Sequence, residues 1–287
     1  MKTTTRTFTI LAILFGICAP SLRAGLVAHW TFDESSGTTA HDSTGNYDGT
    51  LFGGATFVSG GVSGNALSLN ESTNSYVDVG TSFPGFTSGD FSLSIWVKTT
   101  QTSQQWAISK HDAQGQPEGG PNGYALFLNQ SGGVYGNQGG ATFYNSAYSG
   151  HETNSTTLNL NNGQWHMITG VFNSANNTDQ IYIDGTLENT NSGRSPVANN
   201  SPLIIGGVGE TNGNNTPFGL FTGLIDDAQV YNNALTSTEV EYLYQHPGMA
   251  IIPEPQTWAL ALLGLSLLFI RRVRHSRATF IPQRLRR

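Results

Sequence analysis

Oxygen-bearing side chains gather in three short stretches, "TFDES", "AHDSTGNYDG" and "LIDDAQ", which contain Asp33, then Asp42, Asn46 and Asp48, then Asp226 and Asp227. Calcium binds about six to eight oxygens from carboxylates, amides and carbonyls. The stretches therefore make Ca²⁺ the best candidate ligand. The alternative is that Asp42 and Asn46 form Asx turns, and that Asp226 and Asp227 are solvated strand residues.

Other patterns of reactive side chains are missing. No Gly-x-Ser-x-Gly motif occurs in the body of the chain, so a serine hydrolase has no support. The histidines share no metal-binding spacing, and we expect each to be exposed or half-buried. Five of the seven histidines, to which this expectation applies, are His29, His41, His111, His151 and His166.

The composition favours short strands joined by turns. Of 287 residues, 35 are glycine and only 11% are charged, and Asn, Ser and Thr are frequent. "FSLSIWVKT" alternates apolar residues from Phe91 to Val97 with Ser92, Ser94, Trp96 and Lys98. Asp184-Gly185 predicts a two-residue hairpin turn. We therefore expect an all-β fold, a two-sheet antiparallel sandwich.

One short helix is expected near the end of the sandwich. In "NNALTSTEVEYLYQH", Thr236 precedes Glu239 by three residues, which is the spacing of a capping box. Val240, Leu243 and Tyr244 then fall on one face.

The N-terminus has the features of a secretory signal peptide, residues 1–24. Lys2 and Arg6 precede an apolar stretch, and Ala24 suits cleavage before Gly25. The single cysteine, Cys18, lies within the apolar stretch, and the alternative of a lipoprotein lacks a small residue before it. Cleavage after Ala24 would leave no cysteine for a disulfide, a zinc–thiolate site or a thiol nucleophile.

Charge is segregated along the chain. Residues 25–251 contain three basic and 18 acidic residues, a net charge of −15, whereas residues 271–287 contain seven arginines and no acid. A body this acidic repels a phosphate backbone, which excludes nucleic acid as a partner.

The apolar stretch 257–270 predicts a single tilted transmembrane helix, with 271–287 as a basic cytoplasmic tail. Arginines after the stretch place the C-terminus in the cytoplasm and the acidic body outside. The alternative, a buried core helix, does not explain the arginines.

The end of the chain resembles a PEP-CTERM sorting signal. The matching residues lie in the linker 247–256 and beyond it: Pro253, Glu254 and Pro255, the run Trp258–Ile270, and Arg271, Arg272 and Arg274. The resemblance implies recognition by an exosortase, a membrane transpeptidase that cuts near the motif. The chain departs from the family by continuing with "ATFIPQRLRR". Without processing, the two prolines would make a rigid, extended linker.

Residues 25–246 resemble the LamG-like jelly-roll domain of the concanavalin A-like lectin/glucanase superfamily. The phrases that match in order are "LVAHWTFDESSGTTAHDSTGNYDGTL", "GVSGNALSLNESTNSYVDVG", "FSLSIWVKT", "GQWHMITGVF", "IYIDGTLE" and "GLIDDAQVYNNALTSTEVEYLY". The resemblance implies a structural calcium ion where the first and last strands meet, with Asp33, Asp42 and Asp227 as its ligands.

A comparison with the catalytic motif of this superfamily argues against catalysis. Glucanases of the superfamily carry Glu-x-Asp-x-x-Glu on one strand, and this chain lacks that spacing. We therefore expect a non-catalytic cell-surface or matrix protein that binds or adheres, with exopolysaccharide as one candidate partner. A carbohydrate-processing enzyme and a structural coat protein are the alternatives. Aromatic residues that could stack on sugars are Tyr135, Tyr144, Tyr148, Phe218 and Phe221, although core filling is the simpler explanation for most of them.

Overall fold

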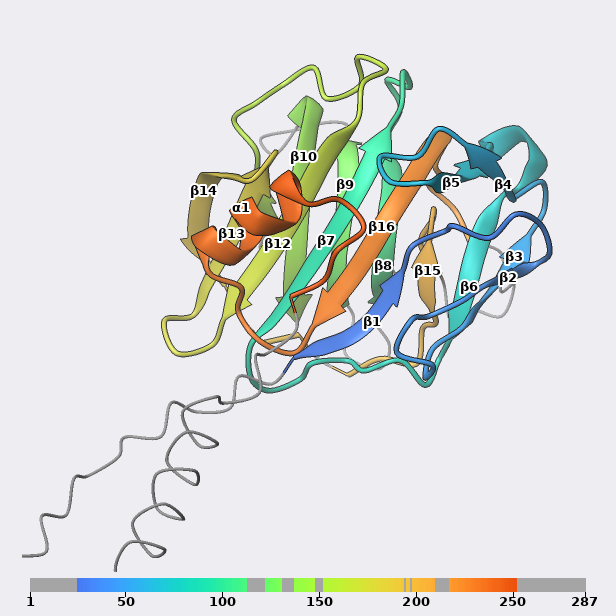
Figure 1. Cartoon of the computed structure of the whole chain (residues 1–287). Helices are drawn as coiled ribbons and strands as arrows, with labels where there is room; N and C mark the ends of the chain where they lie inside the picture. Colours follow the sequence, from blue (N-terminus) through green and yellow to red (C-terminus); the bar gives the residue numbers. More distant parts are fainter. Residues whose placement is uncertain are drawn as a thin grey trace, which may run out of the picture.

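The protein folds as a sandwich of two antiparallel β-sheets, seen face to face in Figure 1. The computed structural model describes residues 25–112, 122–130, 137–147, 152–193, 195–196, 198–209 and 217–251. Each sheet contains eight strands. The predicted all-β, jelly-roll fold is confirmed.

Sheet A has the strand order β14-β13-β12-β7-β16-β5-β4, and β1 also pairs with β16. Its strands are β1 (Leu26–Trp30), β4 (Thr56–Ser59), β5 (Asn65–Leu69), β7 (Phe91–Lys98), β12 (His166–Asn173), β13 (Thr178–Ile183), β14 (Thr186–Ser192) and β16 (Gly223–Tyr231).

Sheet B has the order β11-β10-β9-β8-β15-β6-β3-β2. Its strands are β2 (Thr39–Ala40), β3 (Gly49–Phe52), β6 (Tyr76–Gly80), β8 (Gln105–Asp112), β9 (Asn122–Gln130), β10 (Asn137–Ala147), β11 (Glu152–Asn154) and β15 (Leu203–Ile205). A single 3₁₀ turn, η1 (Glu71–Thr73), precedes β6.

The main core lies between the sheets, and β7 contributes to it as its alternation predicts. Phe91, Leu93 and Ile95 are fully buried there, each stabilising the fold by about 2 kcal/mol. Gly170 on β12 allows a close approach of the two layers, because a Cβ at that position would lie 2.3 Å from the ring of Phe143 on β10.

The two predicted local motifs are both present. Asp184 and Gly185 adopt φ angles of 49° and 81° between β13 and β14, as a two-residue hairpin turn requires. Helix α1 (Ser237–Gln245) begins with a capping box between Thr236 and Glu239. Neighbouring residues determine both features, so both could be predicted from the sequence without knowledge of the rest of the fold.

Helix α1 lies over part of the outer face of sheet A, in front of β12 and β13 (Figure 1). Val240 and Leu243 are buried in a second apolar cluster with Trp96 and Tyr182, which we call the helix-side cluster. The ring of Tyr244 stacks on Trp96 at a centroid distance of 5.5 Å. Trp96, which points away from the main core, is thus buried by the helix.

The described chain continues past His246 to Ile251. No helix in this described part is long and apolar enough to cross a membrane. The expected signal peptide, the motif Pro253–Pro255, the apolar stretch 257–270 and the arginines after it all lie outside the described residues.

Candidate functional site

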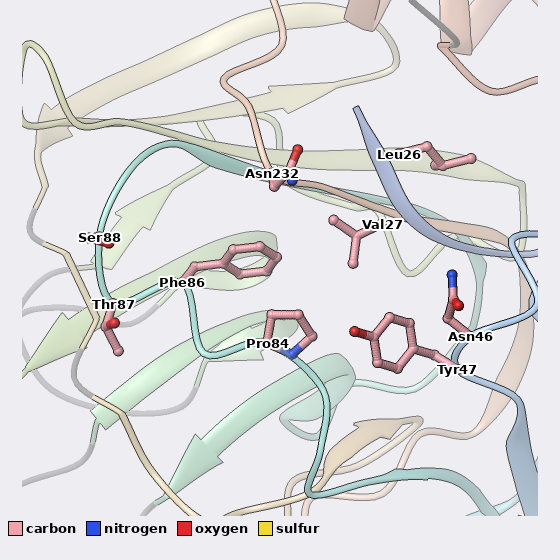
Figure 2. A pocket seen from close by; sticks show the side chains of 9 residues that line it. All are labelled: Leu26, Val27, Asn46, Tyr47, Pro84, Phe86, Thr87, Ser88 and Asn232. Atoms are coloured by element: carbon pink, nitrogen blue, oxygen red, sulfur yellow. The ribbon is translucent and has the colours of Figure 1, made fainter. Parts of the chain in front are cut away.

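An open pocket of about 530 Å³ lies beside the start of β1 (Figure 2). Such a volume is typical of pockets that bind small molecules. Four segments line it: β1, the loop 41–48, the loop between β6 and β7, and the residue after β16. The lining residues are Leu26, Val27, Asn46, Tyr47, Pro84, Phe86, Thr87, Ser88 and Asn232.

Two aromatic rings border the pocket, and Pro84 lies between them (Figure 2). The ring of Tyr47 meets Phe83 edge-on, with centroids 4.7 Å apart, and the Tyr47 carbonyl accepts a hydrogen bond from Trp30 Nε1 at 2.8 Å. The ring of Phe86 stacks on Phe91 at 5.2 Å and 5°. Both rings are half-buried and held by the core, so the pocket wall is preformed.

Asp42 organises the loop that presents Asn46 and Tyr47. Its Oδ1 accepts hydrogen bonds from the backbone N–H groups of His29 (2.9 Å) and Thr44 (3.0 Å). Its Oδ2 accepts from Thr44 Oγ1 (2.5 Å) and from the backbone N–H groups of Asn46 (3.2 Å) and Tyr47 (3.1 Å). Burial alone would raise the pKa of Asp42, but these hydrogen bonds outweigh burial and lower the pKa.

Asp227 is the centre of a second polar network, on β16. Its Oδ1 lies 2.5 Å from His29 Nε2 and accepts from Gln229 Nε2 at 2.7 Å, and its Oδ2 accepts from the Gly248 backbone N–H at 2.8 Å. Asp227 has a φ of 47°, where the register of β16 against β7 shifts. This bulge turns Asp227 toward His29.

The three expected calcium ligands do not converge. His29 joins Asp42 to Asp227, whereas Asp33 accepts its hydrogen bond from the Asn65 N–H at 2.9 Å. Within the described ranges, no group of three or more His, Cys, Asp and Glu side chains could hold a metal ion. Donors already occupy the oxygens of Asp42 and Asp227, so this set does not fit Ca²⁺. Calcium binding stays an untested prediction.

The alternative explanation for these acids, an Asx turn or a solvated strand residue, is correct for Asp42 and wrong for Asp226 and Asp227. The Thr44 N–H bond makes Asp42 the head of an Asx turn, as weighed above. Asp226 and Asp227 are buried rather than solvated. Asp226 Oδ2 accepts from the N–H groups of Val62 (2.7 Å) and Ser63 (3.2 Å), a contact across 164 residues of sequence that no local pattern could reveal.

Two histidines are more deeply buried than expected. His29 is 4% exposed because it pairs with Asp227, and His111 is 3% exposed between Trp106 and Tyr144. Burial lowers the pKa of His111 to about 4, against a smaller opposing effect of Asp112. His166 is half-buried and His41 exposed, as predicted, while His151 lies outside the described residues.

The aromatic residues that were expected to stack on sugars are not the ones that line the pocket. Tyr144 and Phe221 are buried, Phe218 is 41% exposed, and Tyr135 and Tyr148 lie outside the described residues. Tyr47 and Phe86, whose rings border the pocket, were not predicted from the sequence. The only signal was their position in the turn-rich stretches "TGNYDG" and "FPGFTSGD".

Comparison with solved structures gives relatives of the same fold. The binding domain of Paraclostridial Mosquitocidal Protein 1 is 20% identical, with a TM-score of 0.58 over 77% of this chain and 52% of that one. Domain 4 of AbnA, an extracellular arabinanase from Geobacillus stearothermophilus, is 24% identical, with a TM-score of 0.55 over 78% and 100%. A Trypanosoma rangeli sialidase is 16% identical, with a TM-score of 0.52 over 78% and 33%.

The chain thus spans about half of the mosquitocidal chain, a third of the sialidase chain and all of the arabinanase domain. At these identities the likeness is one of fold. No curated protein matches the sequence. The family model described as concanavalin A-like lectin/glucanases superfamily matches residues 71–241, which is more than half of the chain. With its two-sheet sandwich, the chain belongs to the concanavalin A-like lectin/glucanase superfamily.

Proposed function

We propose that this protein is an exported, non-catalytic module that binds an uncharged sugar in the pocket between Tyr47 and Phe86. The lining of the pocket carries the proposal: it combines two rings with the amides of Asn46 and Asn232, and no lining residue is charged. Sugar faces stack on aromatic rings, while their hydroxyl groups exchange hydrogen bonds with amides and hydroxyls. An anionic sugar would be repelled by the surrounding acidic body.

The comparisons support binding as the kind of function. The first relative is a binding domain, and the arabinanase domain was solved in complex with arabinotriose. Both are distant in sequence, so the sugar that this chain would bind cannot be inferred from these relatives. We expect a neutral glycan, with an exopolysaccharide of the producing cell as the first candidate.

Export and sorting form the second part of the proposal. The signal peptide 1–24, the Pro253–Pro255 motif, the apolar stretch and the arginines would deliver the body to the outer side of the cytoplasmic membrane. An exosortase-type enzyme would then cut near the motif and release the body to the surface or matrix. Mass spectrometry of the surface protein should therefore find no "RRVRHSR" peptide, and its recovery there would refute processing.

Sugar binding should depend on the two rings. Replacing Tyr47 or Phe86 with alanine should weaken binding of the sugar by about fivefold or more, because each substitution removes a stacking surface worth roughly 1 kcal/mol or more. The measurement is a glycan array of the full-length chain in detergent, followed by titration of each variant with the sugar found.

Phe52→Ala is the matched control. Phe52 is an exposed aromatic residue, 42% exposed, that stacks on Tyr76 and does not line the pocket. Binding by this variant should equal that of the unmodified chain. Equal losses in all three variants would indicate general damage, and a blank array would leave a protein-binding or coat role instead.

A further inference from the structure

Two aliphatic side chains of β1, those of Leu26 and Val27, line the pocket beside its aromatic rings. The β1–β16 register shifts between Leu26 and Ala28, and this bulge lets two neighbouring residues line the same pocket. Val27 packs against the main core and Leu26 against the helix-side cluster, so both are held in place. In Figure 2 the Val27 side chain points toward the space between Tyr47 and Phe86.

This aliphatic wall favours a sugar that carries a methyl group. The edge of an unsubstituted sugar ring consists of hydroxyl groups, which lose hydrogen bonds to water when they are packed against a valine side chain. A methyl group in the same place gains contact with the wall instead. Deoxy sugars and acetylated sugars both carry one, so the polar groups beside Val27 decide between these classes.

Asn46 presents a hydrogen-bond acceptor next to the wall. Its Nδ2 donates to Thr44 Oγ1 (3.2 Å) and to the Thr44 carbonyl (3.4 Å), which fixes the orientation of the amide because a carbonyl only accepts. No described residue donates to Asn46 Oδ1. Thr44 Oγ1 also lies 3.1 Å from the Val27 carbonyl, so Thr44 holds Val27 and Asn46 side by side. The pocket therefore calls for a ligand donor directly beside the methyl group.

Asn232 and Tyr47 supply donors for another part of the ligand. Within the described ranges, no hydrogen bond engages the Asn232 side-chain amide or the Tyr47 hydroxyl. In Figure 2 the Tyr47 hydroxyl points inward, toward Pro84. Both groups can donate to a ligand oxygen. Because no lining residue is charged, a neutral carbonyl fits these donors better than a carboxylate does.

We propose that the pocket takes an N-acetylated neutral sugar, with its acetamido methyl group against Val27 and its acetamido N–H donating to Asn46 Oδ1. In a trans amide the methyl group and the N–H lie on the same side, opposite the carbonyl oxygen. That arrangement matches an aliphatic wall with an acceptor beside it, and it leaves the carbonyl for Asn232 or Tyr47. A deoxy sugar and an acetyl ester both lack the N–H. The inference rests on the proposed sugar site and narrows it to one class of sugar.

Matched sugars test this inference with the full-length chain in detergent. Triacetylchitotriose and cellotriose have the same linkage and differ only in the acetamido or hydroxyl group on each ring, and N-acetylgalactosamine and galactose form a second pair. In at least one pair the acetylated member should bind about tenfold more tightly or better, because it adds a buried methyl group and a hydrogen bond. Calorimetric titration measures the affinities. Deacetylated oligomers are unsuitable controls, because the acidic body would attract their ammonium groups.

Val27→Thr tests the methyl contact while preserving the shape of the side chain. The variant replaces one methyl group of the wall by a hydroxyl group, so it should bind the acetylated sugar about fourfold more weakly and change any binding of the hydroxyl counterpart by less than about twofold. Val58→Thr is the matched control, because Val58 is half-buried on β4 and does not line the pocket. Its affinities should equal those of the unmodified chain.

The outcomes separate this inference from the proposed function. Equal affinities within both pairs of sugars would overturn the acetamido assignment and leave a site for neutral sugars, as would binding of deoxy sugars alone. Equal losses in Val27→Thr and Val58→Thr would overturn the contact with Val27. Failure to bind any sugar of the array would overturn the inference together with the proposed function.

Discussion

Replacing His29 with alanine should lower the free energy of unfolding by about 3 kcal/mol. The His29 Nε2 atom lies 2.5 Å from Asp227 Oδ1, and the two side chains are only 6% and 2% exposed. Alanine keeps the backbone N–H that binds Asp42, so the change isolates the imidazole. The variant leaves a buried carboxylate with one partner fewer, together with a cavity. Urea unfolding followed by circular dichroism measures the difference.

His41→Ala is the matched control for this pair. The His41 side chain pairs with Asp48, but these two are 66% and 49% exposed, so the loss should stay below about 0.5 kcal/mol. A double-mutant cycle with Asp227→Asn should give a coupling energy of about 1–3 kcal/mol. Asparagine tolerates the positive φ of Asp227, which keeps the bulge intact. Equal losses for His29→Ala and His41→Ala would contradict a stabilising role of the buried pair.

Features that a few neighbouring residues determine could be predicted from the sequence. The Asp184-Gly185 turn and the Thr236–Glu239 capping box are present in the structure, and the apolar residues of β7 from Phe91 to Val97 face the main core as their alternation predicts. Each depends on backbone preferences or on a period of two within a short window. These local signals were sufficient to predict the two-sheet sandwich, because the order of strands and turns limits the architectures available.

Contacts between distant residues could not be predicted. His29 and Asp227 are 198 residues apart, and the bulge in β16 that brings them together has no sequence signature of its own. In a regular strand, the two neighbouring aspartates of "LIDDAQ" would face opposite ways. The bulge changes that alternation, and both side chains are buried by donors from other segments.

The pocket could not be predicted from the sequence for a similar reason. Tyr47 and Phe86 come from two loops, and only the packing of Phe83, Phe91 and Trp30 behind them fixes where their rings lie. The oxygen-rich stretch around Asp42 was interpreted as a metal loop. In the structure its carboxylate accepts hydrogen bonds from backbone N–H groups, which hold the pocket loop in place.

The carboxylates of this body are stabilised chiefly by donors other than lysine and arginine. Residues 25–251 contain only three basic side chains, and the ion pairs found among the described residues involve histidine. Asp42 accepts backbone N–H groups, which supply partial positive charge without a cation and lower its pKa. A buried acid with few such donors should then remain protonated, and Asp179 is in that position.

Burial raises the pKa of Asp179 on β13 to about 7, although a hydrogen bond from Asn145 Nδ2 at 2.8 Å opposes the rise. In the described part of the chain, Asp179 Oδ2 and Asn145 Oδ1 are buried without a hydrogen-bond partner. The neutral acid supplies the O–H donor that these two oxygens lack. Asp179 is therefore expected to be protonated in the folded chain at mildly acidic pH and ionised in the unfolded chain.

The free energy of unfolding should consequently fall as the pH rises from about 4 to about 7. Because the pKa is raised on folding, the folded state binds the extra proton in this window, and stability is lost as that proton leaves. Between pH 5 and pH 8 Asp179 alone should account for about 3 kcal/mol. Asp226, whose pKa burial also raises to about 7, titrates in the same range, so the unmodified chain should lose more than this.

Urea unfolding at a series of pH values checks this expectation. Asp179→Asn replaces the acid by an amide that can donate to Asn145 Oδ1 at every pH, so the variant should lose roughly half of the pH dependence and be the more stable chain at pH 8. Glu241→Gln, at an exposed carboxyl on α1, should leave the profile unchanged. A profile for Asp179→Asn that parallels the unmodified chain would show that Asp179 is ionised in the fold, and would assign the pH dependence to Asp226 instead.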